Sequence, residues 1–262
     1  MMKILIVLEG ERTEPDFFQS LLQKFELNAE LCVVGTNLYT LYHRCKKYDF
    51  ECDIRDVLKE LIKDNATQAM LEQRFACTYL VFDADLHNKA PDQRGKTIPP
   101  EKLIEDNFQK LLEMAEYFTD ETDPSIGRLY INYPMMESFR YCDTFKDDQY
   151  LSTTISIGAL HNFKRFASER KLSGISITTY QKENFIDLIR MNIQRLKNLS
   201  DKHAAVLSYQ AYQILSEAQE IAAKQYDMVQ GKQALFVLNT CLFIILDYFG
   251  NRDHFYDGLV SS

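Results

Sequence analysis

The chain has 262 residues, and its hydrophobic content of 46% is enough for a sizeable buried core. Its net charge of −8 excludes a simple DNA-coating protein, which would be basic because lysine and arginine make the phosphate contacts. An acidic protein can still act on nucleic acid if bound cations and a local basic patch supply positive charge. With 9 glycines and 6 prolines, the sequence argues against an all-β fold full of tight turns.

The first half of the chain alternates between strand and helix patterns. Ile4–Leu8 is a continuous apolar run, typical of a parallel strand that is buried on both faces. Thr13 is expected to cap the helix that follows, with Glu14 and Asp16 in its first turn. Further strands are expected at 31–34, 78–82 and 128–132, and further helices at 37–46, 53–63, 68–75 and 101–118. This alternation predicts βαβ units.

Helical patterns dominate after Pro134. We expect helices at 137–145, 159–171, 181–198, 202–229 and 232–249, with one weak strand at 175–178. The predicted fold class is therefore α/β, with a parallel four-stranded sheet flanked by helices in residues 1–134. A helical portion follows in residues 135–262, and no obvious linker separates the two parts.

No segment predicts secretion or a membrane span. The apolar run at Ile4–Leu8 is too short for a signal peptide, and Ala234–Phe249 contains Asn239 and Asp247 and is shorter than a membrane span. Six cysteines form no CxxC pair, which argues against a zinc ribbon or a redox motif. We expect a cytoplasmic protein with reduced thiols and no membrane partner.

Carboxylates follow two of the expected strands. Glu9 comes directly after the first strand, and Asp83 and Asp85 follow the third. Because ligand sites of parallel α/β sheets lie at the carboxyl ends of the strands, we expect these three side chains to converge. Their mutual repulsion would favour a bound cation, and hard oxygen ligands suit Mg²⁺ or Mn²⁺. A single acid after a strand commonly caps the next helix. The metal-site prediction therefore depends on Glu9, Asp83 and Asp85 following two separate strands.

Several other phosphate-handling sites are excluded by their absent motifs. The chain has no G-x-x-x-x-G-K-[ST] loop, no G-x-G-x-x-G and no G-x-S-x-G. A metal on the carboxylates would instead orient a phosphate and stabilise charge on the attacking and leaving oxygens. The residues alone therefore favour phosphodiester chemistry over nucleotide binding by a glycine-rich loop.

Two motifs resemble the Toprim domain. The stretch from Leu8 to Phe18 reads LEGERTEPDFF and is similar to the EGxxTExxYF opening of the RloB-like branch, while Val81–Asp85 supplies the DxD acids. Pro134–Phe139, PMMESF, is loosely similar to a third segment of that branch, NPxxExW. The resemblance covers roughly residues 3–145.

The resemblance implies a metal-dependent nuclease of the RloB-like and OLD-type group, in bacterial anti-phage defence. Glu9 would be a metal ligand or general base, Asp83 and Asp85 would bind Mg²⁺ or Mn²⁺, and Glu137 would join the same catalytic edge. The implied partners are DNA or RNA and an ATPase encoded alongside. A homo-oligomeric state is left open.

Some nearby residues have two competing interpretations. Glu14 and Glu11 would support the metal, or Glu14 would simply stabilise the first turn of its helix. His87 would contact a phosphate or lie in a solvated loop. Basic residues that would contact nucleic acid, or else belong to ordinary solvated surfaces, are Lys89, Arg94, Lys96, Lys164 and Arg165.

Two departures from the family pattern support an alternative function. Leu86 stands where a glycine commonly follows the DxD, and Tyr133 stands where an asparagine is expected before Pro134. The alternative is a catalytically inactive Toprim-like module that binds a partner ATPase or nucleic acid as a sensor. A third hypothesis, a metal-dependent transferase that holds a nucleotide diphosphate, leaves the Glu9–Phe18 motif unexplained.

Overall fold

The computed structural model describes residues 3–89, 93–123, 125–200 and 207–260. The chain divides into two compact units, Met1–Tyr130 and Ile131–Ser262. The division falls inside strand β5, Gly127–Asn132, rather than in a loop. The predicted boundary was at residue 134, four residues later.

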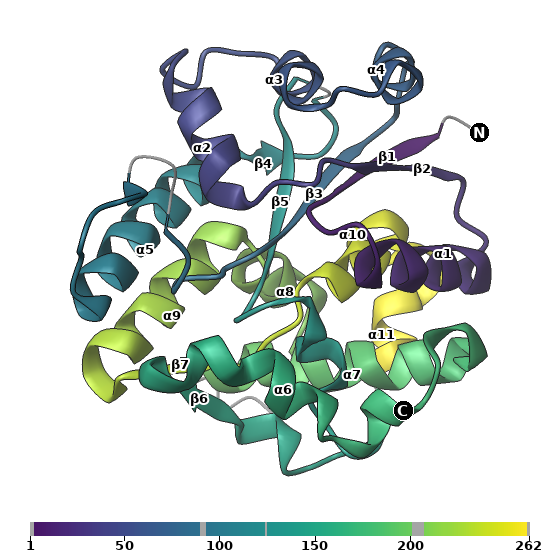
Figure 1. The fold of residues 1–262 in the computed structure, drawn as a ribbon. Coiled ribbons are helices and arrows are strands. Elements are labelled where there is room, and N and C mark those ends of the chain that lie inside the picture. The colour runs from purple at the N-terminus through teal and green to yellow at the C-terminus, as the bar shows by residue number, and fades with distance from the viewer. Residues whose placement is uncertain (1–2, 90–92, 124, 201–206, 261–262) are drawn as a thin grey trace. The chain divides into compact units, whose positions relative to one another are not determined.

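A five-stranded, mostly parallel sheet forms the core of the first unit, which confirms the α/β class. Its strand order is β2-β1-β3-β5-β4 (Figure 1). The strands are β1 Ile4–Leu8, β2 Ala29–Val33, β3 Thr78–Asp83, β4 Thr119–Asp120 and β5. β1 pairs in parallel with both β2 and β3. All four predicted strands are present, and β4 is an unpredicted two-residue strand that runs antiparallel to β5.

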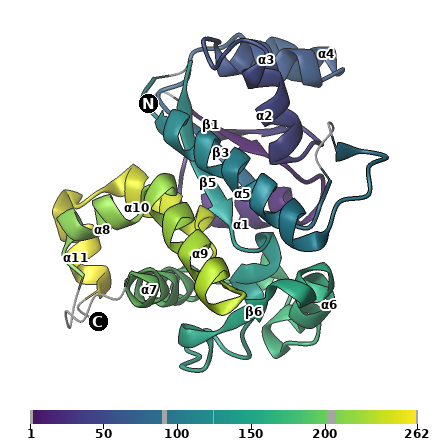
Figure 2. The same ribbon diagram turned by 90° about the vertical axis from the view of Figure 1, so that its left-hand side faces the viewer.

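Helices cover both faces of this sheet. They are α1 Thr13–Phe25, α2 Leu38–Lys46, α3 Ile54–Leu61, α4 Asn65–Leu71 and α5 Pro100–Tyr117. α2 packs against α5 on one face, and α1 lies on the opposite face (Figures 1 and 2). The prediction that Thr13 caps α1 was wrong: Thr13 is the first helical residue, and Arg12 occupies the cap position without a side-chain hydrogen bond.

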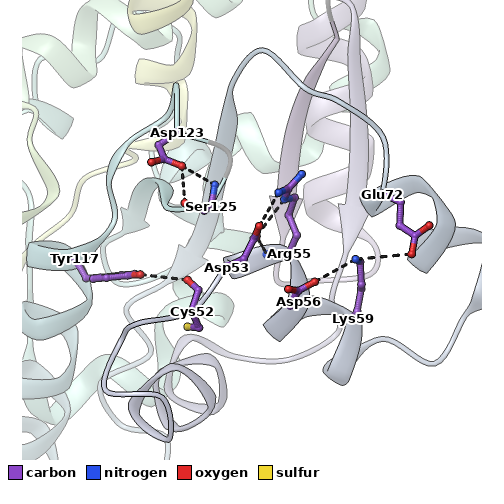
Figure 3. A network of polar contacts seen from close by, with 9 residues as sticks. All are labelled: Cys52, Asp53, Arg55, Asp56, Lys59, Glu72, Tyr117, Asp123 and Ser125. Carbon is purple, nitrogen blue, oxygen red and sulfur yellow. Dashed lines mark hydrogen bonds and ion pairs between the residues drawn. The ribbon is translucent and has the colours of Figure 1, made fainter.

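A polar network fixes α3 to the rest of the first unit (Figure 3). Asp53 caps the helix, because its carboxylate accepts from the Arg55 backbone at 2.9 Å and pairs with the Arg55 guanidinium at 2.6 Å. The Ile54 amide donates to the carbonyl of Ser125 at 2.8 Å. The Tyr117 hydroxyl donates to the carbonyl of Cys52 at 3.3 Å. These contacts tie α3 to α5 and to the segment before β5.

The second unit contains more irregular structure than its sequence predicted. Its helices are α6 Phe163–Ser168, α7 Lys182–Leu199, α8 Tyr209–Leu215, α9 Ala218–Lys232, α10 Ile244–Phe249 and α11 Phe255–Val260. Short 3₁₀ helices are η2 Met136–Arg140, η3 Tyr150–Ser152, η4 Ile157–Asn162, η5 Lys171–Gly174, η6 Ile177–Thr179, η7 Cys241–Phe243 and η8 Arg252–His254. α7 matches its predicted helix almost residue for residue.

Other predictions for the second unit were wrong. The helix expected at 232–249 begins as a strand, β7 Ala234–Phe236, which pairs antiparallel with β6 Thr154–Ser156. The helix expected at 202–229 is two helices, α8 and α9, and its residues 202–206 lie outside the described part of the chain. The weak strand at 175–178 is instead partly the 3₁₀ turn η6.

Arg195 is a fully buried charge that joins α7 to this small sheet. Its Nη2 donates to the carbonyl of Thr153 at 2.7 Å, and its Nε donates to the carbonyl of Val237. The guanidinium lies over the rings of Tyr150 and Phe236, at 4.1 and 4.4 Å from their centroids. One side chain therefore holds the chain just before β6 and just after β7.

Within the described residues, no helix combines the length and apolar character needed to cross a membrane.

Candidate functional site

Strand order places the candidate site at the carboxyl ends of β1 and β3. The chain adds β2 on one side of β1 and β3 on the other, so the direction of winding reverses between β1 and β3. Open α/β sheets bind ligands in the crevice at such a reversal. Glu9 directly follows β1, and Asp83 is the last residue of β3. Their strands are paired in register from Leu5 to Leu8, so the two acids leave the sheet side by side.

Glu9 is held at this edge by the neighbouring strand. The backbone amide of Asp83 donates to Glu9 Oε2 at 3.1 Å. Burial raises the pKa of Glu9 well above its ordinary value, and the carboxylates of Asp85 and Glu14 raise it further, against the lowering effect of that amide. Glu9 thus interacts with the charges of Asp85 and Glu14, and its convergence with both DxD carboxylates on a metal ion stays a prediction.

Glu14 adds a fourth carboxylate on the same side. It is only 8% exposed, although it lies in the first turn of α1. A Cβ atom at Gly10 would come within 2.4 Å of both of its carboxylate oxygens, so the glycine makes room for Glu14. Glu11, in contrast, is exposed, with its carboxylate oxygen beside Gly35. Glu14 therefore belongs to the acidic cluster, and Glu11 lies in the exposed loop.

The loop after β3 is fixed by contacts that the sequence did not reveal. Asp85 adopts a positive φ of 36° and accepts hydrogen bonds from Asn88, at 2.7 Å to its side chain and 2.8 Å to its carbonyl. The Tyr39 hydroxyl from α2 donates to the carbonyl of Ala84, between the two aspartates. Asn107 from α5 donates from its side chain to the carbonyls of Leu86 and Asn88, at 2.9 and 2.8 Å. Tyr39 and Asn107 therefore position the DxD.

The contacts of Asn107 predict a measurable effect of its removal. Asn107→Leu keeps the shape of the buried side chain but leaves two loop carbonyls without a donor, so the free energy of unfolding should fall by about 1–3 kcal/mol. Amide hydrogen exchange in residues 84–88 should also become faster than in the wild type. Gln109→Leu, at an exposed position of α5, is the control. Unchanged exchange in the loop would show that Asn107 does not position it.

The chemical groups of this cluster suit a divalent cation, but the positions of its side chains do not form a ready binding site. Carboxylate oxygens are the donors that Mg²⁺ or Mn²⁺ prefers, and a cation would offset the charges of Asp85 and Glu14 that raise the pKa of Glu9. However, no three His, Cys, Asp or Glu side chains in the described ranges are grouped closely enough to hold a metal ion. The acids share an edge of the sheet without surrounding a common point, so binding would require side-chain rotation.

The raised pKa of Glu9 predicts that its charge destabilises the metal-free protein. A carboxyl group whose pKa is raised on folding contributes stability below its unfolded pKa, near 4.5, and that contribution is lost as the pH rises through the folded value. In EDTA, Glu9→Gln should therefore have a higher free energy of unfolding than the wild type at pH 7. The difference should shrink toward pH 4, where the Glu9 carboxyl is mostly protonated in both the folded and the unfolded wild type.

Denaturant titrations across this pH range measure the effect. Glu116→Gln, at an exposed position of α5, is the control and should track the wild type. A Glu9→Gln variant that is less stable than the wild type at pH 7 would contradict the electrostatic interpretation.

The other predicted residues of the first unit lie in or beside the loop after Asp85. His87 is partly exposed. The Lys89 ammonium donates to the carbonyl of Lys96 at 2.6 Å, which closes the loop on itself. Arg94 is exposed and lines a cavity together with residues of α2. The role of Lys89, Arg94 and Lys96 as nucleic-acid contacts stays a prediction, and the cavity brings residues of α2 beside Arg94.

Three predicted site residues belong to the second unit. Glu137 lies in η2, is 3% exposed and pairs with Lys164 Nζ at 3.1 Å and with Arg140 Nη2 at 4.0 Å. Arg165 is exposed on α6, with its guanidinium over the ring of Phe166. Glu137 is thus a buried acid with two basic partners in its own unit, and its role in catalysis stays a prediction.

No protein-family model, no curated protein and no solved structure matches the chain. The likeness to the Toprim domain therefore rests on the residues of its motifs, Leu8–Phe18 and Val81–Asp85 above all.

Proposed function

We propose that this protein is a metal-dependent nuclease that cleaves phosphodiester bonds at the carboxylate edge of its first unit. The observation that carries the proposal is the position of Glu9 at the winding reversal between β1 and β3, where its carboxylate accepts from the Asp83 amide and interacts with the charge of Asp85. A parallel sheet collects its functional groups there, and a cluster of carboxylates at that position would be costly without a cation. No glycine-rich phosphate loop competes for the role.

The residues would divide the work according to their surroundings. Asp83 and Asp85 would hold Mg²⁺ or Mn²⁺, which when bound supplies charge stabilisation for the attacking and leaving oxygens. Glu9 suits a general base, because the Asp83 amide holds its carboxylate beside the DxD aspartates. The amide of Asp83 orients the Glu9 carboxylate, and Tyr39 and Asn107 keep the aspartates in place.

The wider setting follows from the motif resemblance. The RloB-like pattern in Leu8–Phe18 supports DNA or RNA as substrate and a cytoplasmic role in bacterial anti-phage defence, alongside a partner ATPase. The test is cleavage of labelled DNA and RNA with Mn²⁺ or Mg²⁺ by the wild type and by Asp83→Ala. A wild type that cleaves neither substrate, or a variant that cleaves as well as the wild type, would overturn the proposal.

A second candidate is a catalytically inactive module that binds a partner ATPase or nucleic acid. It is favoured by the absence, among the described residues, of a ready group of three metal-binding side chains, and by Leu86 after the DxD. This candidate predicts weak or no binding of Mn²⁺. Tight, Glu9-dependent binding in a calorimetric titration would argue against it.

A further inference from the structure

A basic cavity lies on the first unit, separate from the carboxylates. Its volume is about 550 Å³. It is lined by Thr40, His43, Arg44, Lys46, Lys47 and Arg94. Five of these six side chains are basic, whereas the chain as a whole carries a net charge of −8. Such a local concentration of positive charge on an acidic protein calls for an anionic ligand.

The cavity follows from the two faces of α2. Leu38, Leu41, Tyr42 and Cys45 recur at helical spacing and are buried in the core. Thr40, His43, Arg44 and Lys47 recur at the same spacing on another face and line the cavity. Asn37 caps the helix by accepting from the Thr40 amide at 3.0 Å, which fixes where both faces begin. From Thr40 to Lys47 this face extends about 10 Å along the helix, with its basic residues in the second half.

Helix stability alone does not account for this arrangement. Basic residues in the last turn do favour the helix dipole, which would explain Arg44 and Lys46. Arg94, however, comes from the loop after the DxD and lines the same cavity from outside the helix. The ion pairs of Arg44 with Glu60 and of Lys46 with Glu113 are exposed and so contribute little stability. Their cations can exchange onto a ligand.

Two features connect the cavity with the carboxylate edge. Tyr39, which binds the Ala84 carbonyl between Asp83 and Asp85, is adjacent in sequence to Thr40 of the cavity. Arg94 belongs to the same loop region that begins at Asp85. A nucleic-acid strand bound along α2 would therefore lead toward Glu9, Asp83 and Asp85. Its phosphates would be repelled by these carboxylates unless a cation is present.

We propose that the basic cavity of α2 and Arg94 binds the sugar–phosphate backbone of the nucleic-acid strand that is cleaved at the carboxylate edge. The identity of the ligand rests on the proposed nuclease function. With a rise of about 3.4 Å per nucleotide along one strand, the 10 Å face from Thr40 to Lys47 matches about two or three consecutive nucleotides. Backbone contacts of this kind position a strand and do not read its sequence.

The test measures binding without catalysis. Fluorescence anisotropy in EDTA, with labelled single- and double-stranded oligonucleotides of about 16 nucleotides, compares the wild type with Lys47→Gln/Arg94→Gln. The double variant should bind about tenfold more weakly at low salt, and the slope of log affinity against log salt should flatten by about 0.7–0.9 per removed contact. Lys63→Gln/Arg74→Gln removes the same charges from exposed positions outside the cavity and is the matched control.

Each outcome decides the question. Equal losses of oligonucleotide affinity in the two double variants, or no loss in either, would overturn the cavity as a backbone site. A wild type that binds inorganic phosphate or a nucleoside monophosphate in the cavity but no oligonucleotide would also overturn it. Cleavage by a wild type whose binding ignores the cavity leaves the nuclease proposal standing alone. Cavity-dependent binding without any metal-dependent cleavage supports the cavity and removes the nuclease.

Discussion

Asp83→Ala should lower Mn²⁺-dependent cleavage by at least about 10²–10⁴-fold, because the loss of a charge-stabilising or proton-transferring group costs rates of that order. Asp83 is the last residue of β3, and its backbone also orients Glu9, so the substitution removes one carboxylate and leaves the amide that holds the other. Initial rates on labelled DNA and RNA over a series of Mn²⁺ concentrations give the measurement. If excess Mn²⁺ restores the cleavage rate of the variant, Asp83 acts by binding the metal ion.

A control separates chemistry from folding in this experiment. Asp56→Ala removes an exposed acid of α3 whose ion pair with Lys59 is a surface one, so it should cleave like the wild type. Thermal melting of Asp83→Ala should show a folded protein. A folded variant that retains full cleavage would remove Asp83 from the site.

Arg195→Ala should lower the free energy of unfolding by about 3–5 kcal/mol, which is among the largest effects that one substitution produces. The substitution opens a cavity between Tyr150 and Phe236 and removes the guanidinium that donates to the carbonyls of Thr153 and Val237, of which Thr153 keeps only the Val237 amide at 3.2 Å. Burial lowers the pKa of Arg195 to about 10, so the charge is retained at neutral pH, where these hydrogen bonds are charge-assisted.

Urea denaturation of the full chain measures this loss. Arg165→Ala removes an exposed guanidinium that also lies over an aromatic ring, and it should change stability by less than about 0.5 kcal/mol. Arg195→Lys should recover only part of the loss, because a single ammonium lacks the planar fork that reaches both carbonyls. Equal stability of Arg195→Ala and the wild type would exclude the structural role.

The sequence predicted those strands and helices whose burial pattern is visible in their own residues. β1 was predictable because its five apolar residues are buried on both faces, as in a parallel strand. α7 was predictable because its apolar positions repeat with helical spacing over eighteen residues. β7 was missed because an uninterrupted apolar run fits a buried strand and a buried helix equally well. Its strand state depends on pairing with β6, nearly 80 residues away in the chain.

The candidate site shows the same division between local and distant information. Glu9 and Asp83 could be placed together because each follows an apolar strand, and parallel strands end at one edge. Tyr39 and Asn107 were missed because they bind loop carbonyls from distant helices, and such contacts leave no local pattern. The basic face of α2 could have been found from the spacing of Thr40, His43, Arg44 and Lys47, but its link with Arg94 depends on the fold.

The absence of a linker between the two units limits how this chain can be altered. The unit boundary falls between Tyr130 and Ile131, inside β5, so the same strand ends one unit and begins the other. Successive side chains of a strand point to opposite faces, so one residue inserted or deleted there would invert every position that follows in the strand. Neither unit can be replaced by joining a new sequence at a loop between the units. Chimaeras or truncations would have to keep Gly127–Asn132 intact.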